Sequence, residues 1–234
     1  MRRIACQECT VRDLTCFAEL SPDDLAEFQA CRITGLYKPR QVIFHEGTPA
    51  GGLWVVCQGT VKLYRSDRFG RDFIIDVATP GAILGELVLD DVETYSASAE
   101  ALTPSQLSFL PRARLVRFVE RHPQTGVRLA ATLSRALADA RRRAGELALK
   151  RADARLADLL LRLAGGAAGD GPTRIRLAYS RRDLAEMIGV STETAIRLLA
   201  RLKRGRMIAT NHREVVITDV ERLTRLAHQG ALDG

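Results

Sequence analysis

The first 111 residues alternate between short apolar runs and turn residues, after one short helical pattern. Residues 20–30, LSPDDLAEFQA, predict a helix that begins after Ser21 and carries acidic residues in its first turn. Four apolar or alternating segments follow, and Gly and Pro residues separate them: QVIFHEG, GGLWVVCQGTVKLYRS, RDFIIDVATPGAILGEL and SASAEALTPSQLSFLP. Short, closely spaced strands of this kind predict a β-barrel or jelly roll.

The pattern becomes helical from Arg112 to about Leu163, with a break predicted at His122-Pro123. After this break, apolar residues recur at alternating steps of three and four, which is the spacing of a helix-pairing seam. The seam consists of Ala130, Leu133, Leu137, Ala140, Ala144 and Leu147. Two interpretations follow from it: a dimerisation helix, or a helix that packs on the barrel of its own chain.

The last third contains the most specific pattern, SRRDLAEMIGVSTETAIRLLARLKRGRMI. One helix with an apolar face ends at Gly189, which tolerates the positive φ of a sharp turn. Ser191 is a suitable N-cap for the next helix. On that helix Glu193, Ile196 and Arg197 are left facing outward, and MIATNHREVVIT predicts a two-stranded wing. The pattern predicts a helix-turn-helix whose second helix enters the DNA major groove; the alternative is a small helical bundle that binds protein.

Charge supports a polyanionic partner, although a solvated basic surface would look the same. Residues 150–234 hold 16 Lys and Arg against 10 Asp and Glu, a net charge of +6, whereas residues 1–149 hold 19 and 18. No apolar run reaches the roughly 18 residues of a membrane span, and the N-terminus lacks the apolar core of a signal peptide. We therefore expect a cytoplasmic protein without membrane contact, in which structural disulfides are not expected.

These motifs together resemble the Crp/Fnr family of bacterial transcription regulators, over nearly the whole chain. The quoted segments that carry the resemblance are PGAILGEL, the long helix and IGVSTETAIRLLARLK. The resemblance implies that Glu193 and Arg197 read bases as an E-x-x-x-R pair, with Ile196 between them favouring an apolar contact such as a thymine methyl. It also implies phosphate contacts from Ser180, Arg182, Ser191 and Thr194.

The resemblance leaves the signal open. Gly85, Glu86 and Leu87 match the family's nucleotide-binding segment, but Tyr95 stands before Ser96 where the phosphate-binding arginine is expected. Cyclic AMP is therefore not expected to bind, because a phosphodiester would lose its strongest contact, and Glu86 is interpreted as a structural remnant at a turn.

The cysteines Cys6, Cys9 and Cys16 are spaced similarly to the N-terminal cluster of Fnr, with one additional residue, which implies metal ligands for an iron–sulfur cluster. Ser108 occupies the family's fourth ligand position, so Cys57, Cys31 or a non-cysteine ligand would have to substitute. Zinc binding or thiol redox sensing, and no ligand role at all, are the other two interpretations.

The sequence thus predicts an α+β protein with three parts: a sensor β-roll of the cyclic-nucleotide-binding type at 1–111, a dimerisation helix and hinge at 112–149, and a winged helix-turn-helix at 150–234. We expect a homodimeric regulator that binds double-stranded palindromic DNA and acts with RNA polymerase. An enzyme on a jelly-roll scaffold is the first rival, but the four histidines are scattered and no catalytic residues are predicted. A cyclic-nucleotide-binding module without a DNA function is the second.

Overall fold

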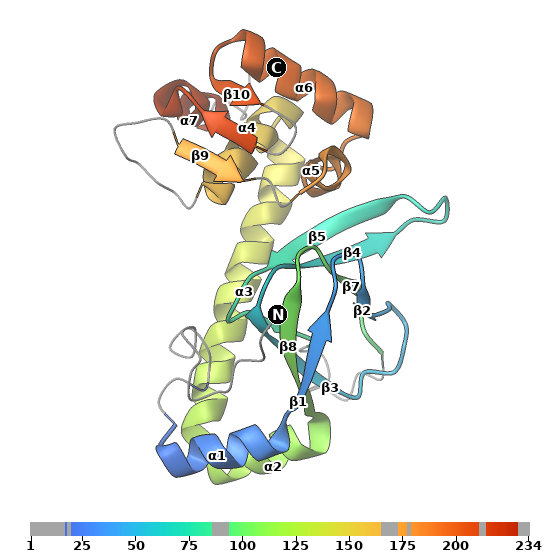
Figure 1. Ribbon diagram of the computed structural model, residues 1–234, viewed down its shortest axis with the longest axis vertical. Helices are drawn as coiled ribbons and strands as arrows, with labels where there is room; N and C mark the ends of the chain where they lie inside the picture. The colour runs from blue at the N-terminus through green and yellow to red at the C-terminus, as the bar shows by residue number, and fades with distance from the viewer. Residues whose placement is uncertain are drawn as a thin grey trace. The chain divides into compact units, whose positions relative to one another are not determined.

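The computed structural model describes Phe17, residues 20–85, 94–164, 173–176, 179–210 and 214–228. Contacts within the chain divide it into two compact units, one centred on the β-sheets before Ala138 and one formed mainly by residues from Asp139 onward (Figure 1). No helix of the described residues is long and apolar enough to cross a membrane.

Two four-stranded sheets form the first unit, in the orders β1-β8-β3-β6 and β2-β7-β4-β5. The predicted jelly roll is therefore confirmed. The strands are β1 (Ile33–Tyr37), β2 (Val42–Phe44), β3 (Gly52–Gln58), β4 (Val61–Ser66), β5 (Asp72–Ala78), β6 (Ile83–Leu84), β7 (Ser98–Ala101) and β8 (Ser105–Pro111).

The register between β3 and β8 shows that the two faces of the first sheet contribute side chains to two different hydrophobic cores. Trp54 pairs with Phe109 and Val56 with Leu107, on the face that meets the second sheet. The alternate residues point the other way because successive side chains of a strand leave opposite faces. Leu53 and Leu110 on that face, which the structure buries completely, pack against helices.

The helices that cover this outer face are α1 (Pro22–Cys31), α2 (Arg112–Arg121) and the start of α3 (Pro123–Leu149). The Ser21 side chain accepts a hydrogen bond from the Asp24 amide and caps α1 as predicted. The break at His122-Pro123 is also where the structure separates α2 from α3. Phe17, Phe28 and Phe118 form a ring cluster beneath these helices, with centroids 4.0 to 6.3 Å apart.

The second unit is a winged helix-turn-helix. Its leucine-rich core joins all of its helices to a small antiparallel sheet of order β10-β11-β9. The two-stranded wing predicted from MIATNHREVVIT is confirmed in its two strands, while residues 211–213 lie outside the described residues. The elements are α4 (Ala152–Leu163), β9 (Thr173–Arg176), α5 (Arg181–Ile188), α6 (Thr192–Arg204), β10 (Ile208–Thr210), β11 (Glu214–Ile217) and α7 (Val220–His228).

Helix α7 was not predicted from the sequence. Leu223 and Ala227 are buried on it, four residues apart, and both join the core of this unit. The helix closes the side of the core next to α4 (Figure 1).

Candidate nucleic-acid interface

The turn between α5 and α6 has the geometry that the sequence predicted. Gly189 lies at φ 65° and ψ 46°, in the left-handed region where a side chain would be strained. The Val190 amide donates to the Ala185 carbonyl at 3.1 Å, which closes the end of α5. Leu184, Ala185 and Ile188 are buried beneath this turn. The crossing of α5 and α6 is therefore fixed by packing as well as by the turn.

Both helices begin at a capping serine. Ser180 and Asp183 form a reciprocal capping box: the Ser180 hydroxyl accepts from the Asp183 amide at 3.1 Å, and the Asp183 carboxylate accepts from the Ser180 amide at 2.7 Å. The Ser180 hydroxyl also donates to this carboxylate at 2.7 Å. Ser191 caps α6 by accepting from the Thr194 amide at 3.2 Å. The hydroxyls predicted to contact phosphates thus hold the starts of the helices as well.

The outward face of α6 carries the three predicted base-reading residues. Glu193 and Arg197 are exposed, and half of the Ile196 surface is open to solvent. A bond from the Glu193 backbone amide and one from the Ser191 hydroxyl hold the pKa of the Glu193 carboxyl below its ordinary value, and the charge of Arg197 adds to this effect. Glu193 is therefore a permanently ionised acceptor near neutral pH.

The guanidinium of Arg197 is held by its own helix. It donates to the Thr194 hydroxyl at 3.1 Å, one turn earlier on α6. Ala195, Leu199 and Leu202 occupy the opposite face and are buried in the core. The sequence therefore assigned the inward and outward sides of this helix correctly.

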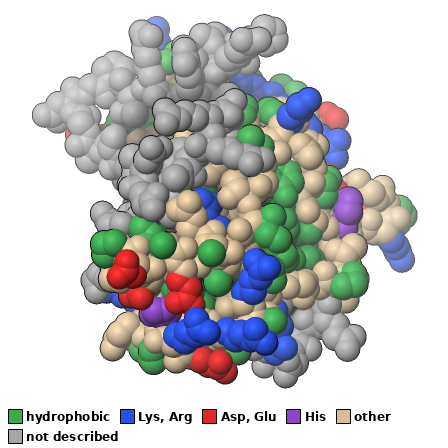
Figure 2. Space-filling model, turned by 60° about the horizontal axis from the view of Figure 1, so that its bottom comes forward, with side chains coloured by type: hydrophobic (Ala, Val, Ile, Leu, Met, Phe, Trp, Pro, Cys, Tyr) green, Lys and Arg blue, Asp and Glu red, His purple; other side chains and the backbone are tan. Residues whose placement is uncertain are grey.

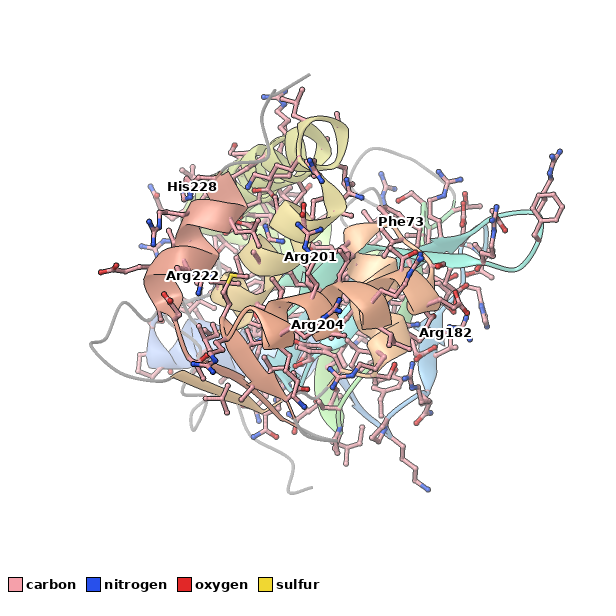
Figure 3. All side chains as sticks on the ribbon, turned by 90° about the horizontal axis from the view of Figure 1, so that it is seen from above. Phe73, Arg182, Arg201, Arg204, Arg222 and His228 are labelled. Carbon is pink, nitrogen blue, oxygen red and sulfur yellow. The ribbon has the colours of Figure 1, made fainter. Side chains whose placement is uncertain are left out.

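Arg182 projects from the first turn of α5 (Figure 3). Its Nε donates to the Glu186 carboxylate at 2.6 Å, and Glu186 is itself buried. The Arg182 Nη2 lies 3.3 Å from the Asp72 carboxylate, so two carboxylates fix the guanidinium, while about three-fifths of the side chain stays exposed.

The basic residues at the end of α6 differ in their surroundings. Arg201 turns to α4, where its Nη2 lies 2.9 Å from the buried carboxylate of Asp153 (Figure 3). Lys203 and Arg204 remain exposed. Part of the positive charge of this end is therefore neutralised within the unit.

Tyr95, which stands where the resemblance implies a phosphate-binding arginine, is a core residue of the β-roll. It is 7% exposed, its hydroxyl donates to the Gly52 carbonyl at 3.2 Å, and it accepts from Trp54 Nε1 at 3.1 Å. The ring lies so close to Gly85 that a Cβ there would sit 2.8 Å from it. Burial raises the pKa of the Tyr95 hydroxyl, which therefore stays neutral. Glu86 and Leu87 lie outside the described residues.

The predicted metal ligands Cys6, Cys9 and Cys16 also lie outside the described residues. Of the two remaining cysteines, Cys57 on β3 has its sulfur 3.2 Å from the hydroxyl of Ser108 on β8. Ser108 is fully buried and accepts from Arg32 Nη1 at 2.6 Å. A thiol thus lies directly beside the position of the expected fourth ligand.

Cys31 has a different setting, at the end of α1. It lines a cavity of about 290 Å³ between α1 and α2, together with Glu27 and three arginines of α2: Arg114, Arg117 and Arg121. Figure 2, which turns this end of the roll toward the viewer, shows Lys and Arg side chains next to Asp and Glu side chains. Arg114 lies 3.4 Å from the carbonyl of Cys31.

The fold and the exposed face of α6 define the class of protein, a DNA-binding regulator built from a β-roll and a winged helix-turn-helix. Comparison with known proteins agrees. A model of the cyclic nucleotide-binding domain matches residues 35–122, and a model of the Crp-like helix-turn-helix domain matches residues 154–226. The chain belongs to the Crp/Fnr family of transcription regulators, as the sequence motifs implied.

Individual relatives span nearly the whole chain. The transcriptional activator protein Anr of Pseudomonas aeruginosa is 29% identical over 98% of this chain and 94% of its own length. The nitrogen fixation regulation protein FixK of Bradyrhizobium diazoefficiens is 29% identical over 95% of this chain and 93% of its own. The structure of FixK2 from Bradyrhizobium japonicum superposes with a TM-score of 0.73 at 25% identity, covering 87% of this chain and 99% of that one. These relatives are transcription regulators and not enzymes.

Two residues of structural importance have no distinguishing sequence signal. Asp153 and Arg155 stand in the first turn of α4, where each bonds to other helices of the unit. In the sequence they belong to an Arg- and Asp-containing stretch, RADARLAD, that has the composition of a solvated surface. No local pattern distinguishes them, because the α6 partner of Asp153 lies 48 positions farther along the chain and the α5 partner of Arg155 lies 33 positions farther along.

Proposed function

We propose that the protein binds palindromic DNA as a homodimer, through α3 of each subunit. The observation that carries this proposal is the uncovered seam of α3. Leu129 at its start is buried against the roll, and Leu133 packs there in part. Farther along, Leu137 is 51% exposed, and Ala140 and Ala144 are exposed as well. An apolar seam left open on a 27-residue helix favours pairing with a second copy.

Both interpretations of the seam then apply to different parts of the helix. The first turns pack on the roll of their own chain, and the later turns are available to the partner. Two α3 helices paired about a two-fold axis would present two α6 helices to a duplex. Half-sites about one helical turn apart follow from this symmetry.

Base reading is assigned to Glu193, Ile196 and Arg197. Arg197 has the fork of donors that pairs with guanine O6 and N7, and ionised Glu193 can accept from cytosine N4. Ile196 offers an apolar surface to a thymine methyl. All three stand on the first two turns of α6, which is the part of a recognition helix that enters the groove.

Phosphate contacts are assigned to Arg182, Ser180, Ser191 and Thr194. Arg182 supplies the charge, and the serines and the threonine stand at helix N-termini, where the helix dipole favours an anion. Such contacts position the protein on the duplex without reading its sequence.

The test is binding-site selection with the full chain, followed by sedimentation of the complex on the selected duplex. We expect a palindromic motif and two chains per duplex. A selected motif without two-fold symmetry, or one chain per duplex, would contradict the proposal.

For the signal, we propose that Cys6, Cys9 and Cys16 hold an iron–sulfur cluster and that Cys57 supplies the fourth thiolate. Such clusters are held by four cysteine thiolates, and the contact between Cys57 and Ser108 is what favours Cys57 over Cys31. The Arg32 guanidinium is bonded to Ser108, which gives this position a positively charged neighbour. A bound cluster would supply sensitivity to oxygen or nitric oxide.

The test of the cluster is anaerobic purification with an absorption spectrum and metal analysis. We expect broad visible absorbance that bleaches in air. Zinc without iron would assign the cysteines to a zinc site, and metal-free, colourless protein would leave them without a ligand role.

The last partner that we propose is RNA polymerase, because the Pseudomonas relative is a transcriptional activator.

A further inference from the structure

The first turn of α4 holds the ends of two other helices through one side chain. Arg155 Nε donates to the Ile188 carbonyl, the last residue of α5, at 2.9 Å. Its Nη1 donates to the carbonyls of Lys150 at 2.8 Å and Leu147 at 3.3 Å, at the end of α3. One guanidinium therefore links the end of the proposed dimerisation helix to the first helix of the helix-turn-helix.

These three acceptors suit an arginine. The last carbonyls of a helix lack intrahelical partners, and they form the negative end of the helix dipole. Arginine carries five donors in a rigid fork, so it can satisfy two such ends at once, which a lysine cannot do with the same geometry. Burial lowers the pKa of Arg155, but an arginine remains charged near neutral pH.

The same turn of α4 also holds the recognition helix. Asp153, 7% exposed, pairs with Arg201 of α6 at 2.9 Å. A second link ties α3 to α4, where Arg162 Nη1 lies 2.8 Å from Glu146. Helix α4 is thus the element at which the end of α3 and both helices of the helix-turn-helix meet.

We propose that Arg155 is a positioning residue that fixes the orientation of α5 and α6 relative to the end of α3, and so selects the half-site spacing that the dimer accepts. The inference rests on the proposed homodimer. One base pair of extra spacing moves a half-site by about 3.4 Å and turns it by roughly one-tenth of a helical turn. Only a rigid joint between α3 and the reading helices can discriminate between such neighbouring spacings.

The test uses the full chain and four duplexes: the selected palindrome, the same palindrome one base pair shorter and one longer, and a single half-site. Arg155→Met keeps the apolar stem and removes the donors. We expect the ratio of affinities between the preferred and the altered spacings to fall by roughly 5-fold or more. Affinity for the single half-site should stay within about 2-fold, since no base or phosphate contact is removed.

Arg225→Met is the matched control. Arg225 is an exposed arginine of α7, so this variant loses the same charge from the same unit without touching the joint. It should keep the wild-type spacing ratio. The spacing ratio of Arg155→Lys should lie between those of Arg155→Met and the wild-type protein, because lysine restores the charge but not the fork of donors.

A folded Arg155→Met protein with the wild-type spacing ratio would overturn the inference. If Arg155→Met does not fold, Arg155→Lys is held to the same criterion. If both lose half-site binding together with their thermal transition, Arg155 is a stabilising residue only, and the positioning role is wrong. Wild-type protein that shows no preferred spacing would instead contradict the proposed dimer.

Discussion

The ring of Tyr95 stacks on the ring of Phe44, with centroids 4.0 Å apart and planes inclined by 20°. This pair fills the inside of the β-roll at the place where the family resemblance implies a nucleotide phosphate. The Trp54 ring lies 6.2 Å from Phe44 and extends the cluster. The roll therefore uses this position for packing.

Cyclic AMP should not bind, because the Tyr95 ring would have to leave the core and no guanidinium would replace it. Calorimetry with cyclic AMP and cyclic GMP should show no heat of binding. Micromolar affinity for either would overturn the expectation. Tyr95→Phe should keep the stacking and lose the bonds to Gly52 and Trp54, at a cost of about 1 kcal/mol for each bond in the free energy of unfolding.

Arg197→Ala should weaken binding to the preferred site by roughly 1–3 kcal/mol and relax one position in each half-site. The reason is the loss of a bidentate base contact. Arg182→Ala is the contrasting variant: it should weaken binding to all sequences about equally and reduce the salt dependence. Binding-site selection on both proteins is the measurement. An unchanged motif for Arg197→Ala would show that α6 is not the helix that reads the major groove.

Leu137→Glu should separate the dimer, because it places a charge in the open seam of α3. Sedimentation at micromolar concentration should show a monomer where the wild-type protein is a dimer. Leu149→Glu is the control, since Leu149 is 65% exposed but lies outside the seam. A dimeric Leu137→Glu protein would place the subunit interface elsewhere.

Lowering the pH should destabilise the junction between α3 and α4, because protonation of Glu146 removes its charge interactions. Burial would raise the pKa of this carboxyl, but the hydrogen bond and charge of Arg162 and the charges of Lys150 and Arg142 outweigh burial and lower it. A lowered folded-state pKa gives stability that is present above the unfolded value and is lost as the pH falls through the folded value.

Glu146→Gln should therefore cost roughly 1 kcal/mol at neutral pH and less as the pH falls below the ordinary glutamate range. Chemical denaturation of both proteins at several pH values gives the difference. A difference that stays constant down to strongly acidic pH would show that the charge of Glu146 does not stabilise the fold.

Cys57→Ser should abolish the visible absorbance of anaerobically prepared protein, as Cys6→Ser, Cys9→Ser and Cys16→Ser should. Cys31→Ser should leave it unchanged, because Cys31 lies between α1 and α2 and makes no contact with Ser108 among the described residues. Colour retained in Cys57→Ser and lost in Cys31→Ser would reverse the assignment of the fourth ligand.

The architecture, and the side of α6 that faces outward, could be predicted from the sequence alone. Period-two and helical patterns are local, so the strands, the capping serines Ser21 and Ser191, and the turn at Gly189 could be predicted from neighbouring residues. The inward and outward sides of α6 followed from the same helical period. The family resemblance then added roles for Glu193 and Arg197 that spacing alone does not supply.

The pairing of side chains from distant segments could not be predicted from the sequence. The stacking of Tyr95 on Phe44, the contact between Cys57 and Ser108, and the bonds of Arg155 to two helix ends join residues that are far apart in the chain. A periodic pattern records whether a side chain points inward, but it does not record its partner. The partner depends on how sheets and helices pack, and packing is a property of the whole folded chain.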